Sequence, residues 1–355
     1  MPITSDLWYT CTESLCAEIL QRRKTGETMR FLYEETAAGI RILRCFGEDP
    51  SVMLPETVAG RPVTELGAYA FSDHIDQREL ETAMQKGRFC REDGEPAKET
   101  EEMPEKRTAV SGEAIREVIL PETLKKIGRY AFYNCRKLTQ LALGGACMDV
   151  GAGAFTGCHQ VEEIRITVLP DGSSALREIL TELPETIRVD WKKENIQGVF
   201  WFPEFFEEGV ENTPARILEN HIHGSGLRYR NCFVRKNLNI REYDELFPYA
   251  RAWEEEGVVL KMALGRLLNP VELGEKAEEQ YFSHIQEHFA EAARILMLSG
   301  EYANLGTLLA RLKPEKALLE KLLVMAQEQK DTEAVSLFMD RLHKHTKVQR
   351  KVFEL

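Results

Sequence analysis

The chain has 355 residues, of which 43% are apolar and 29% are charged, a composition typical of a globular protein with room for two or three domains. Its formal net charge of −12 and pI near 5.4 argue against a nucleic-acid binder or an anionic-membrane binder, because either would present a basic face. No run of residues approaches the ~18 apolar residues that a membrane span requires.

The first 28 residues are expected to form an N-terminal helix or cap. They lack a basic segment, and Asp6 and Glu13 interrupt their apolar residues, so they do not fit the pattern of a secretory signal. We therefore expect a cytoplasmic protein in which the eight cysteines are reduced. No two cysteines form a C-x-x-C pair, and we expect neither a metal site nor a cofactor.

Two short strands are predicted in the next segment, "FLYEETAAGIRILRCF", on either side of Ala38 and Gly39. We expect this pair to cap one open end of the structure that follows it.

Residues 76–113 mix both charge signs and show little apolar periodicity. We expect a charged insertion that runs over the surface and is largely disordered. The alternative is a recruitment segment that becomes ordered on a partner.

A fixed step of 23 residues relates successive segments within 115–166. When the sequence is aligned with itself at an offset of 23 residues, four residues are identical to the residue 23 positions later: Gly128, Ala131, Phe132 and Cys135. A unit this short cannot bury its own apolar face, so it must stack on its neighbours. The L-x-x-L-x-L part predicts a strand, and the G-x-x-A-F-x-x-C part predicts a turn whose glycine needs a positive φ or a close backbone approach.

These motifs resemble the BspA-type leucine-rich repeat, a bacterial unit that reads roughly L-x-x-I-x-L-P-x-x-L-x-x-I-G-x-x-A-F-x-x-C. The segment from Val52 to Phe71, "VMLPETVAGRPVTELGAYAF", fits as an earlier copy with a longer turn. The resemblance covers residues 29–190 and implies a short solenoid with a parallel β-sheet. We expect Phe71, Phe132 and Phe155 to stack inside it. Many proteins of this type are exported adhesins, which makes an adhesin the family's own alternative.

Side chains that alternate with the apolar ones in each predicted strand point outward and form the expected partner-binding face. Only three strands are well defined, so this face is smaller than the ~800 Å² per partner of a standard interface. It would need help from the 76–113 insertion or from the basic patch described below. The face comprises Glu117, Ile119, Gln140, Ala142, Glu163 and Arg165.

A last string of the same kind, Leu183-Pro184-Glu185-Thr186, lies outside the 23-residue register, and we interpret it as a degenerate terminal coil. After Trp191 the apolar pattern becomes helical, so residues 198–350 are predicted to form an α-helical repeat-like domain. Pro214, after a capping Asn212 or Thr213, predicts a helix start. Later helices are expected to end at Gly257, before Pro270 and at Gly300, and three more to span 302–312, 314–329 and 332–344.

The connections between these later helices are only a few residues long, so neighbouring helices are expected to pack antiparallel as helical hairpins. The predicted fold class is therefore α+β and multidomain, with a leucine-rich-repeat solenoid followed by a helical-hairpin domain.

Residues 219–237 are unusually basic for this acidic chain, and four interpretations remain open. The first is a solvated glycine-rich turn. The second is a protein-docking patch at Arg228, Tyr229 and Arg230, because Arg and Tyr are favoured at interface hot spots. The third is anion binding at the turn 224–226. The fourth is a metal site made of His221, His223 and Cys232.

Catalytic templates are not met. Ser225 lies in G-S-G rather than G-x-S-x-G, and no phosphate-binding glycine motif follows a predicted strand. His284 and His288 lie one helical turn apart, but "HIQEH" lacks the glutamate position of a zinc protease, so we interpret them as a solvated helix face. We therefore predict a non-catalytic scaffold that binds a protein partner through a two-part platform. The alternatives are a surface adhesin, and an enzyme or ligand sensor with its site at the domain junction.

Overall fold

The computed structural model describes residues 29–98, 109–212 and 217–350. The N-terminal helix or cap predicted for residues 1–28 lies outside this part of the chain. Two compact units are separated within helix α5 (Ile240–Glu245): Met1–Tyr243 and Asp244–Leu355. No helix among the described residues is both long enough and apolar enough to cross a membrane.

The first unit begins with the two strands that the sequence predicts around Gly39. Strand β1 (Arg30–Glu35) pairs antiparallel with β2 (Ile40–Phe46). The turn between them closes with a hydrogen bond of 2.8 Å from the Thr36 N–H to the Gly39 carbonyl. A Cβ on Gly39 would lie 2.4 Å from the Pro62 carbonyl oxygen, and φ there is +153°, so only glycine fits.

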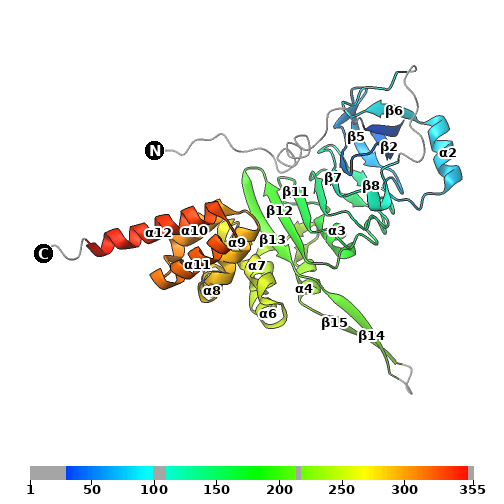
Figure 1. Ribbon diagram of the computed structural model, residues 1–355. Helices are drawn as coiled ribbons and strands as arrows, with labels where there is room; N and C mark the ends of the chain where they lie inside the picture. Colours follow the sequence, from blue (N-terminus) through cyan, green and yellow to red (C-terminus); the bar gives the residue numbers. More distant parts are fainter. Residues whose placement is uncertain (1–28, 99–108, 213–216, 351–355) are drawn as a thin grey trace. The chain divides into compact units, whose positions relative to one another are not determined.

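Two sheets run through the repeated segment, where the sequence predicts one (Figure 1). The first has the order β13-β12-β11-β9-β7-β3 and consists of β3 (Ser51–Met53), β7 (Glu117–Ile119), β9 (Gln140–Leu143), β11 (Glu163–Thr167), β12 (Ile187–Lys193) and β13 (Ile196–Phe202). The second contains β1 and β2 together with β4 (Thr57–Val58), β5 (Arg61–Leu66), β6 (Arg88–Arg91), β8 (Lys126–Ile127) and β10 (Asp149–Val150).

The register of the first sheet reproduces the 23-residue step. Glu117 faces Gln140 across the β7–β9 pair, and Gln140 faces Glu163 across the β9–β11 pair, with all three strands parallel. One position along, Val118, Leu141 and Ile164 oppose one another and are at most 1% exposed. The step is therefore the distance along the chain from one parallel strand to the next, and the apolar positions face the interior.

The repeated glycine is required by close approach of the backbone. A Cβ on Gly128 would lie 2.5 Å from the Ala68 nitrogen, and one on Gly151 would lie 2.3 Å from the Arg129 nitrogen. The positive φ of the turn lies two residues later, at 55° for Tyr130 and 68° for Gly153. The tight turn thus requires a residue without a side chain at the repeated glycine and a positive φ two residues later. The sequence motif identifies only the first of these requirements.

Phe71, Phe132 and Phe155 form the stack that the repeat predicts. Their ring centroids are 5.0 Å apart at each step, the rings are within 12° of parallel, and all three side chains are fully buried. The backbone supports the same arrangement, because the Phe132 N–H donates to the Ala154 carbonyl at 2.8 Å. The repeated cysteines pack beside the rings as free, buried thiols.

Strand β12 ends the parallel series, preceded by helix α3 (Leu176–Glu182). Glu182 lies at the end of this helix and accepts hydrogen bonds from the Gly153 N–H at 2.8 Å and from the Phe155 N–H at 2.7 Å. In the preceding unit the N–H of Phe132 donates to the backbone carbonyl of Ala154. The Glu182 carboxylate therefore satisfies the N–H groups of the last turn, where no further repeat follows.

The charged insertion contains ordered structure, contrary to the prediction for residues 76–113. Helix α2 spans Gln77–Lys86, strand β6 pairs antiparallel with β1, and a 3₁₀ turn, η2, spans Gly112–Ala114. Asp76 caps α2 by accepting from the Arg78 and Glu79 N–H groups. The order comes from long-range packing: Phe89 of β6 joins Leu32 and Phe46 in a separate apolar cluster, which the local charge pattern does not reveal.

The helix predicted to start at Pro214 is wrong. Strand β14 (Phe206–Asn212) pairs antiparallel with β15 (Ile217–His223), and the two extend as a narrow hairpin (Figure 1). Residues 198–238 are thus largely non-helical, with short helix α4 (Gly226–Arg230) and strands β16 (Phe233–Val234) and β17 (Asn237–Leu238) after the hairpin. Pairing between segments overrides the local capping signal.

The second unit is helical. Helix α10 (Tyr302–Leu312) has the predicted bounds, while the long segment that ends at Gly300 is split into two helices at His288. The remaining helices are α6 (Phe247–Trp253), α7 (Glu256–Leu268), α8 (Glu275–Glu287), α9 (Phe289–Leu298), α11 (Lys316–Glu328) and α12 (Thr332–Arg350). Their apolar faces bury one continuous core that runs from Phe247 to Phe338.

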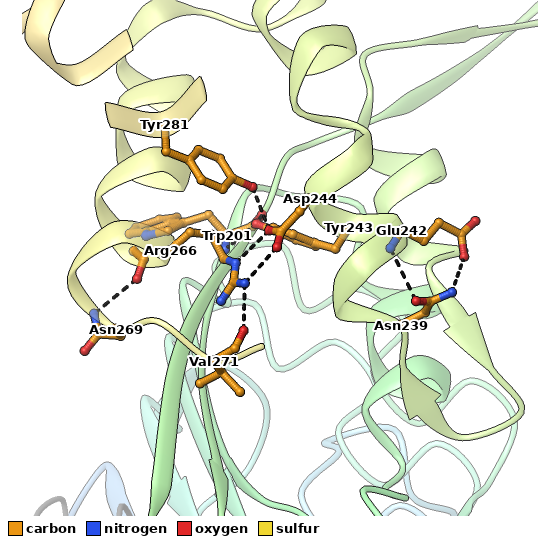
Figure 2. A network of polar contacts seen from close by, with 10 residues as sticks. Trp201, Asn239, Glu242, Tyr243, Asp244, Arg266, Asn269, Val271 and Tyr281 are labelled. Carbon is orange, nitrogen blue, oxygen red and sulfur yellow. Dashed lines mark hydrogen bonds and ion pairs between the residues drawn. The ribbon is translucent and has the colours of Figure 1, made fainter. Parts of the chain in front are cut away.

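A buried ion pair fixes the start of this unit. Arg266 is fully buried and donates to both carboxylate oxygens of Asp244, from Nε at 2.7 Å and from Nη2 at 2.8 Å. Tyr281 donates to the same carboxylate at 2.8 Å, and Arg266 also donates to the Val271 carbonyl (Figure 2). On the first unit's side of the boundary, Tyr243 Oη donates to the Trp201 carbonyl at 2.6 Å.

Candidate functional site

A row of polar side chains crosses the outer face of the first sheet. Each member occupies the same position in its own strand, because the parallel pairings bring these positions opposite one another. We call this the polar row, and it comprises Ser51, Glu117, Gln140, Glu163 and Arg188.

Neighbouring members of the polar row contact each other. Ser51 Oγ donates to Glu117 Oε2 at 3.0 Å, and Gln140 Nε2 donates to Glu163 Oε2 at 3.4 Å. The Gln140 Oε1 atom is buried and has no hydrogen-bond partner among the described residues.

A second row, two residues further along the strands, supplies charges that pair with the first. Arg165 Nε lies 2.5 Å from Glu163 Oε1, and Arg188 Nε lies 2.8 Å from Asp190 Oδ1. Burial raises the pKa of the Asp190 carboxyl, against the opposing effects of Arg188 and Arg165. The side chains of both pairs are only 15–28% exposed, so each pair has a defined geometry.

Two residues of the predicted face do not contribute to it. Ile119 and Ala142 face each other across β7 and β9, but they are 3% and 0% exposed and pack with Met53 as a small apolar cluster. These two residues therefore pack against other apolar side chains, and the prediction that they belong to the contact face is corrected. Alternation along a strand shows which face a side chain lies on, and it does not show whether that face is covered at that point.

The predicted basic docking patch is also corrected. Tyr229 is fully buried and Arg230 is 2% exposed, which leaves only Arg228 at the surface. Arg230 donates to the carbonyls of Leu183 and Glu185, at 2.7 and 2.6 Å from Nη2. Its guanidinium satisfies backbone carbonyls at the end of the repeat, a structural role that the basic composition of the segment concealed.

The other two interpretations of residues 219–237 also fail on geometry. Ser225 and Gly226 are buried, and a Cβ on Gly226 would lie 2.2 Å from the Pro203 carbonyl oxygen, so this turn does not offer an open anion cradle. His223 contacts Glu208 across the hairpin at 2.9 Å, whereas the Cys232 thiol is buried beside the Arg228 carbonyl. These residues therefore do not converge on a metal position.

Sequence reasoning missed Arg188 and Asp190 because β12 falls outside the 23-residue step. A signal was present: Arg188-x-Asp190 repeats the alternation of opposite charges seen at Glu163-x-Arg165. The carboxylates of Glu163 and Asp190 are each held by an arginine. The two rows thus present paired charges on the same face of the first sheet.

Residues 107–178 match the family described as "BspA type Leucine rich repeat region (6 copies)". They form a BspA-type leucine-rich repeat region. A crystal structure titled as a leucine-rich repeat protein of T. pallidum is 20% identical to the chain, covering 41% of the chain and 73% of its own length with a TM-score of 0.17. No curated protein matches the chain. BspA-type regions generally serve protein–protein interaction or adhesion and are generally non-enzymatic.

Proposed function

We propose that this protein is a non-catalytic interaction scaffold whose first unit binds a protein partner along the polar row. The observation that carries the proposal is the in-register array of polar side chains on five parallel strands. Strands about 4.8 Å apart make this array roughly 19 Å long. That length suits an extended segment or an exposed helix face of another protein.

The charges of the polar row suit a partner with both signs of charge. Glu117 and Glu163 lie on either side of Gln140, and the one basic side chain, Arg188, lies at the end of the row next to Glu163. Such an arrangement contributes mainly to orientation and association rate, because paired surface charges add little net affinity. The exposed Arg228 is included as an outlying contact residue.

The row by itself is smaller than a standard interface of ~800 Å² per partner. We therefore propose that the helical second unit supplies the other part of the platform, built as a repeat-like series of helical hairpins. A solenoid followed by such a domain gives two separate surfaces on one chain. The repeated architecture of the first unit supports binding over catalysis, because repeat proteins present extended surfaces.

We also propose that the protein acts in a reducing compartment such as the cytoplasm. The six cysteines within the described residues are all free and buried. Secreted proteins more often use cysteines in disulfides. Labelling of thiols after denaturation, in extracts protected from air, should count all eight cysteines. A disulfide between Cys135 and Cys158 would instead support the adhesin alternative.

The central test is a pull-down of the full chain from native extract with Glu163→Arg. This change reverses the charge beside Arg165 and places two cations within the row, so one reproducible partner should be lost or reduced at least tenfold. Arg228→Ala should weaken the same partner by a smaller factor, because that residue lies outside the row.

The matched control is Glu194→Arg, the same charge reversal on the exposed turn between β12 and β13. It should leave the partner bound. Equal loss in both variants would show a general effect of charge and would contradict the polar row as the binding site. Absence of any protein partner, together with a small molecule that co-purifies, would overturn the scaffold in favour of a ligand sensor.

A further inference from the structure

Three potential metal ligands meet inside the second unit, far from the polar row in the sequence. Glu256 is the first residue of α7, while His284 lies in the last turn of α8 and His288 directly follows that helix. One donor atom from each side chain lies within 4.8 Å of the other two. The Glu256 Oε1 atom is 2.8 Å from His284 Nε2 and 3.7 Å from His288 Nδ1.

His284 is not on a solvated helix face, as the sequence pattern led us to expect. Its side chain is 3% exposed, and its ring makes an edge contact with Phe247 and lies 4.8 Å from the His288 ring. His284 Nδ1 has no hydrogen-bond partner among the described residues, and the Glu256 carboxylate is the ion-pair partner of Nε2 at 2.8 Å. A buried ring nitrogen without a hydrogen bond calls for an explanation.

Glu256 and His288 remain accessible, with side chains 45% and 40% exposed. The cluster therefore has one buried ligand that fixes its position and two ligands at the surface through which an ion could enter. Zinc bonds to histidine nitrogen and carboxylate oxygen at about 2.0–2.2 Å, so the ligand atoms of one ion stand roughly 3–3.5 Å apart. The observed separations need only small side-chain rotations to reach that geometry.

We propose that Glu256, His284 and His288 bind a divalent transition-metal ion, with zinc as the best fit. Two imidazoles and one carboxylate suit zinc and its neighbours better than they suit magnesium or calcium, which prefer oxygen ligands. Three protein ligands leave at least one position for water, as in zinc sites that are open to solvent. Bound metal would join the start of α7 to the end of α8.

The electrostatic surroundings permit this binding. A metal binds the neutral form of an imidazole, and the His284 ring is buried beside Phe247. Arg251 opposes a cation because its charge acts on the same histidine, but its Nη2 atom lies 3.9 Å from the Glu287 carboxylate. With Glu256 and Glu287 both close by, the local charge does not repel a divalent ion.

Other His–Glu contacts in the described chain provide the comparison. His159 lies 2.8 Å from Glu185, and His223 lies 2.9 Å from Glu208, yet neither pair belongs to a group of three potential ligands. These two pairs show that a histidine and a glutamate can form an ion pair without a third potential ligand nearby. The alternative to metal binding is that Glu256 and His284 form such a pair, which only holds α7 against α8.

The test uses the full chain, stripped of metal with a chelator and with its accessible thiols blocked, because cysteines also bind zinc. Zn²⁺ is titrated in competition with a chromophoric chelator, and Co²⁺ is added to a second sample for its visible spectrum. We expect one ion per chain with micromolar or tighter affinity, and cobalt bands of nitrogen and oxygen ligation. His288→Gln, which changes an accessible side chain, should weaken Zn²⁺ binding by more than the ~10–100-fold typical of losing a second-shell partner.

Glu256→Gln should weaken binding by a similar factor, and His159→Gln should leave it unchanged. Because His284 is buried, His284→Gln is measured only alongside a circular dichroism spectrum that shows a folded helical unit. Failure of the wild-type chain to bind Zn²⁺ or Co²⁺, or binding that His288→Gln and His159→Gln leave equally strong, would overturn the proposal. Binding of zinc and binding of a protein partner are independent readouts, so either proposal can fail without the other.

Discussion

The phenylalanine stack makes the sharpest prediction about the repeat, because Phe132 lies between two other rings. It contacts Phe71 on one side and Phe155 on the other at the same 5.0 Å spacing, and it is fully buried. Phe132→Ala removes a large buried side chain, which costs ~3–5 kcal/mol in a protein core. It also removes two aromatic contacts, which contribute ~0.5–1.5 kcal/mol each. We therefore expect a loss near the upper end of that range, about 4–5 kcal/mol.

A loss of this size is a large part of the ~5–15 kcal/mol that stabilises a typical domain. The assay is urea unfolding followed by circular dichroism, in which the two units are expected to give separable transitions. Phe132→Ala should move the transition of the first unit and leave that of the helical unit in place. Phe155→Ala is the matched control, since its ring has one stacked neighbour among the described residues and should cost about 0.5–1.5 kcal/mol less.

Two outcomes would refute this reasoning. An unchanged first transition would mean that the rings do not stack in the folded protein. An equal loss for both variants would mean that burial alone, without the central position in the stack, determines the cost.

Three further predictions concern the charges and thiols. Asp244→Ala leaves the buried Arg266 charge without its carboxylate and should destabilise the second unit by ~3–5 kcal/mol. The double substitution Asp244→Leu/Arg266→Met should recover most of that loss in the same unfolding assay. Glu182→Ala removes the acceptor of two backbone N–H groups and should cost the first unit ~1.5–3 kcal/mol, while Glu182→Gln, which keeps one oxygen, should cost less. Burial raises the pKa of Cys90, Cys147 and Cys232 to about 12. At pH 8 roughly one in 10⁴ of these thiols is therefore ionised. A thiol reagent should label them in the native protein only at the rate of unfolding. These folded-state pKa values lie above the unfolded value of about 8.5, so the stability that they contribute is fully present below pH 8.5 and is lost as the pH rises towards 12. Unfolding measured at alkaline pH should show this loss. Rapid labelling of the native protein at pH 8 would contradict the buried environment of these thiols.

Features that repeat, or that depend on local periodicity, could be predicted from the amino-acid sequence. The 23-residue step gave the strand register, because parallel strands in successive units must oppose equivalent residues. It also gave the ring stack, since identical positions of stacked units lie above one another. Helix α10 was predicted at its observed bounds, because the chain before it turns at Gly300 and the chain after it meets Pro314.

Features that depend on contacts between segments distant in the sequence could be known only from the folded structure. The pairing of β14 with β15 overrode the helix signal at Pro214, because backbone hydrogen bonds between strands outweigh a single capping preference. Arg230 is buried because carbonyls from Leu183 and Glu185 converge on it, and a local basic composition cannot show that convergence. His284 meets Glu256 only when α7 packs on α8, so the spacing of the two histidines could not reveal the carboxylate between them. Periodicity thus fixes what each segment buries, while the partners of a buried polar group are fixed by which segments meet.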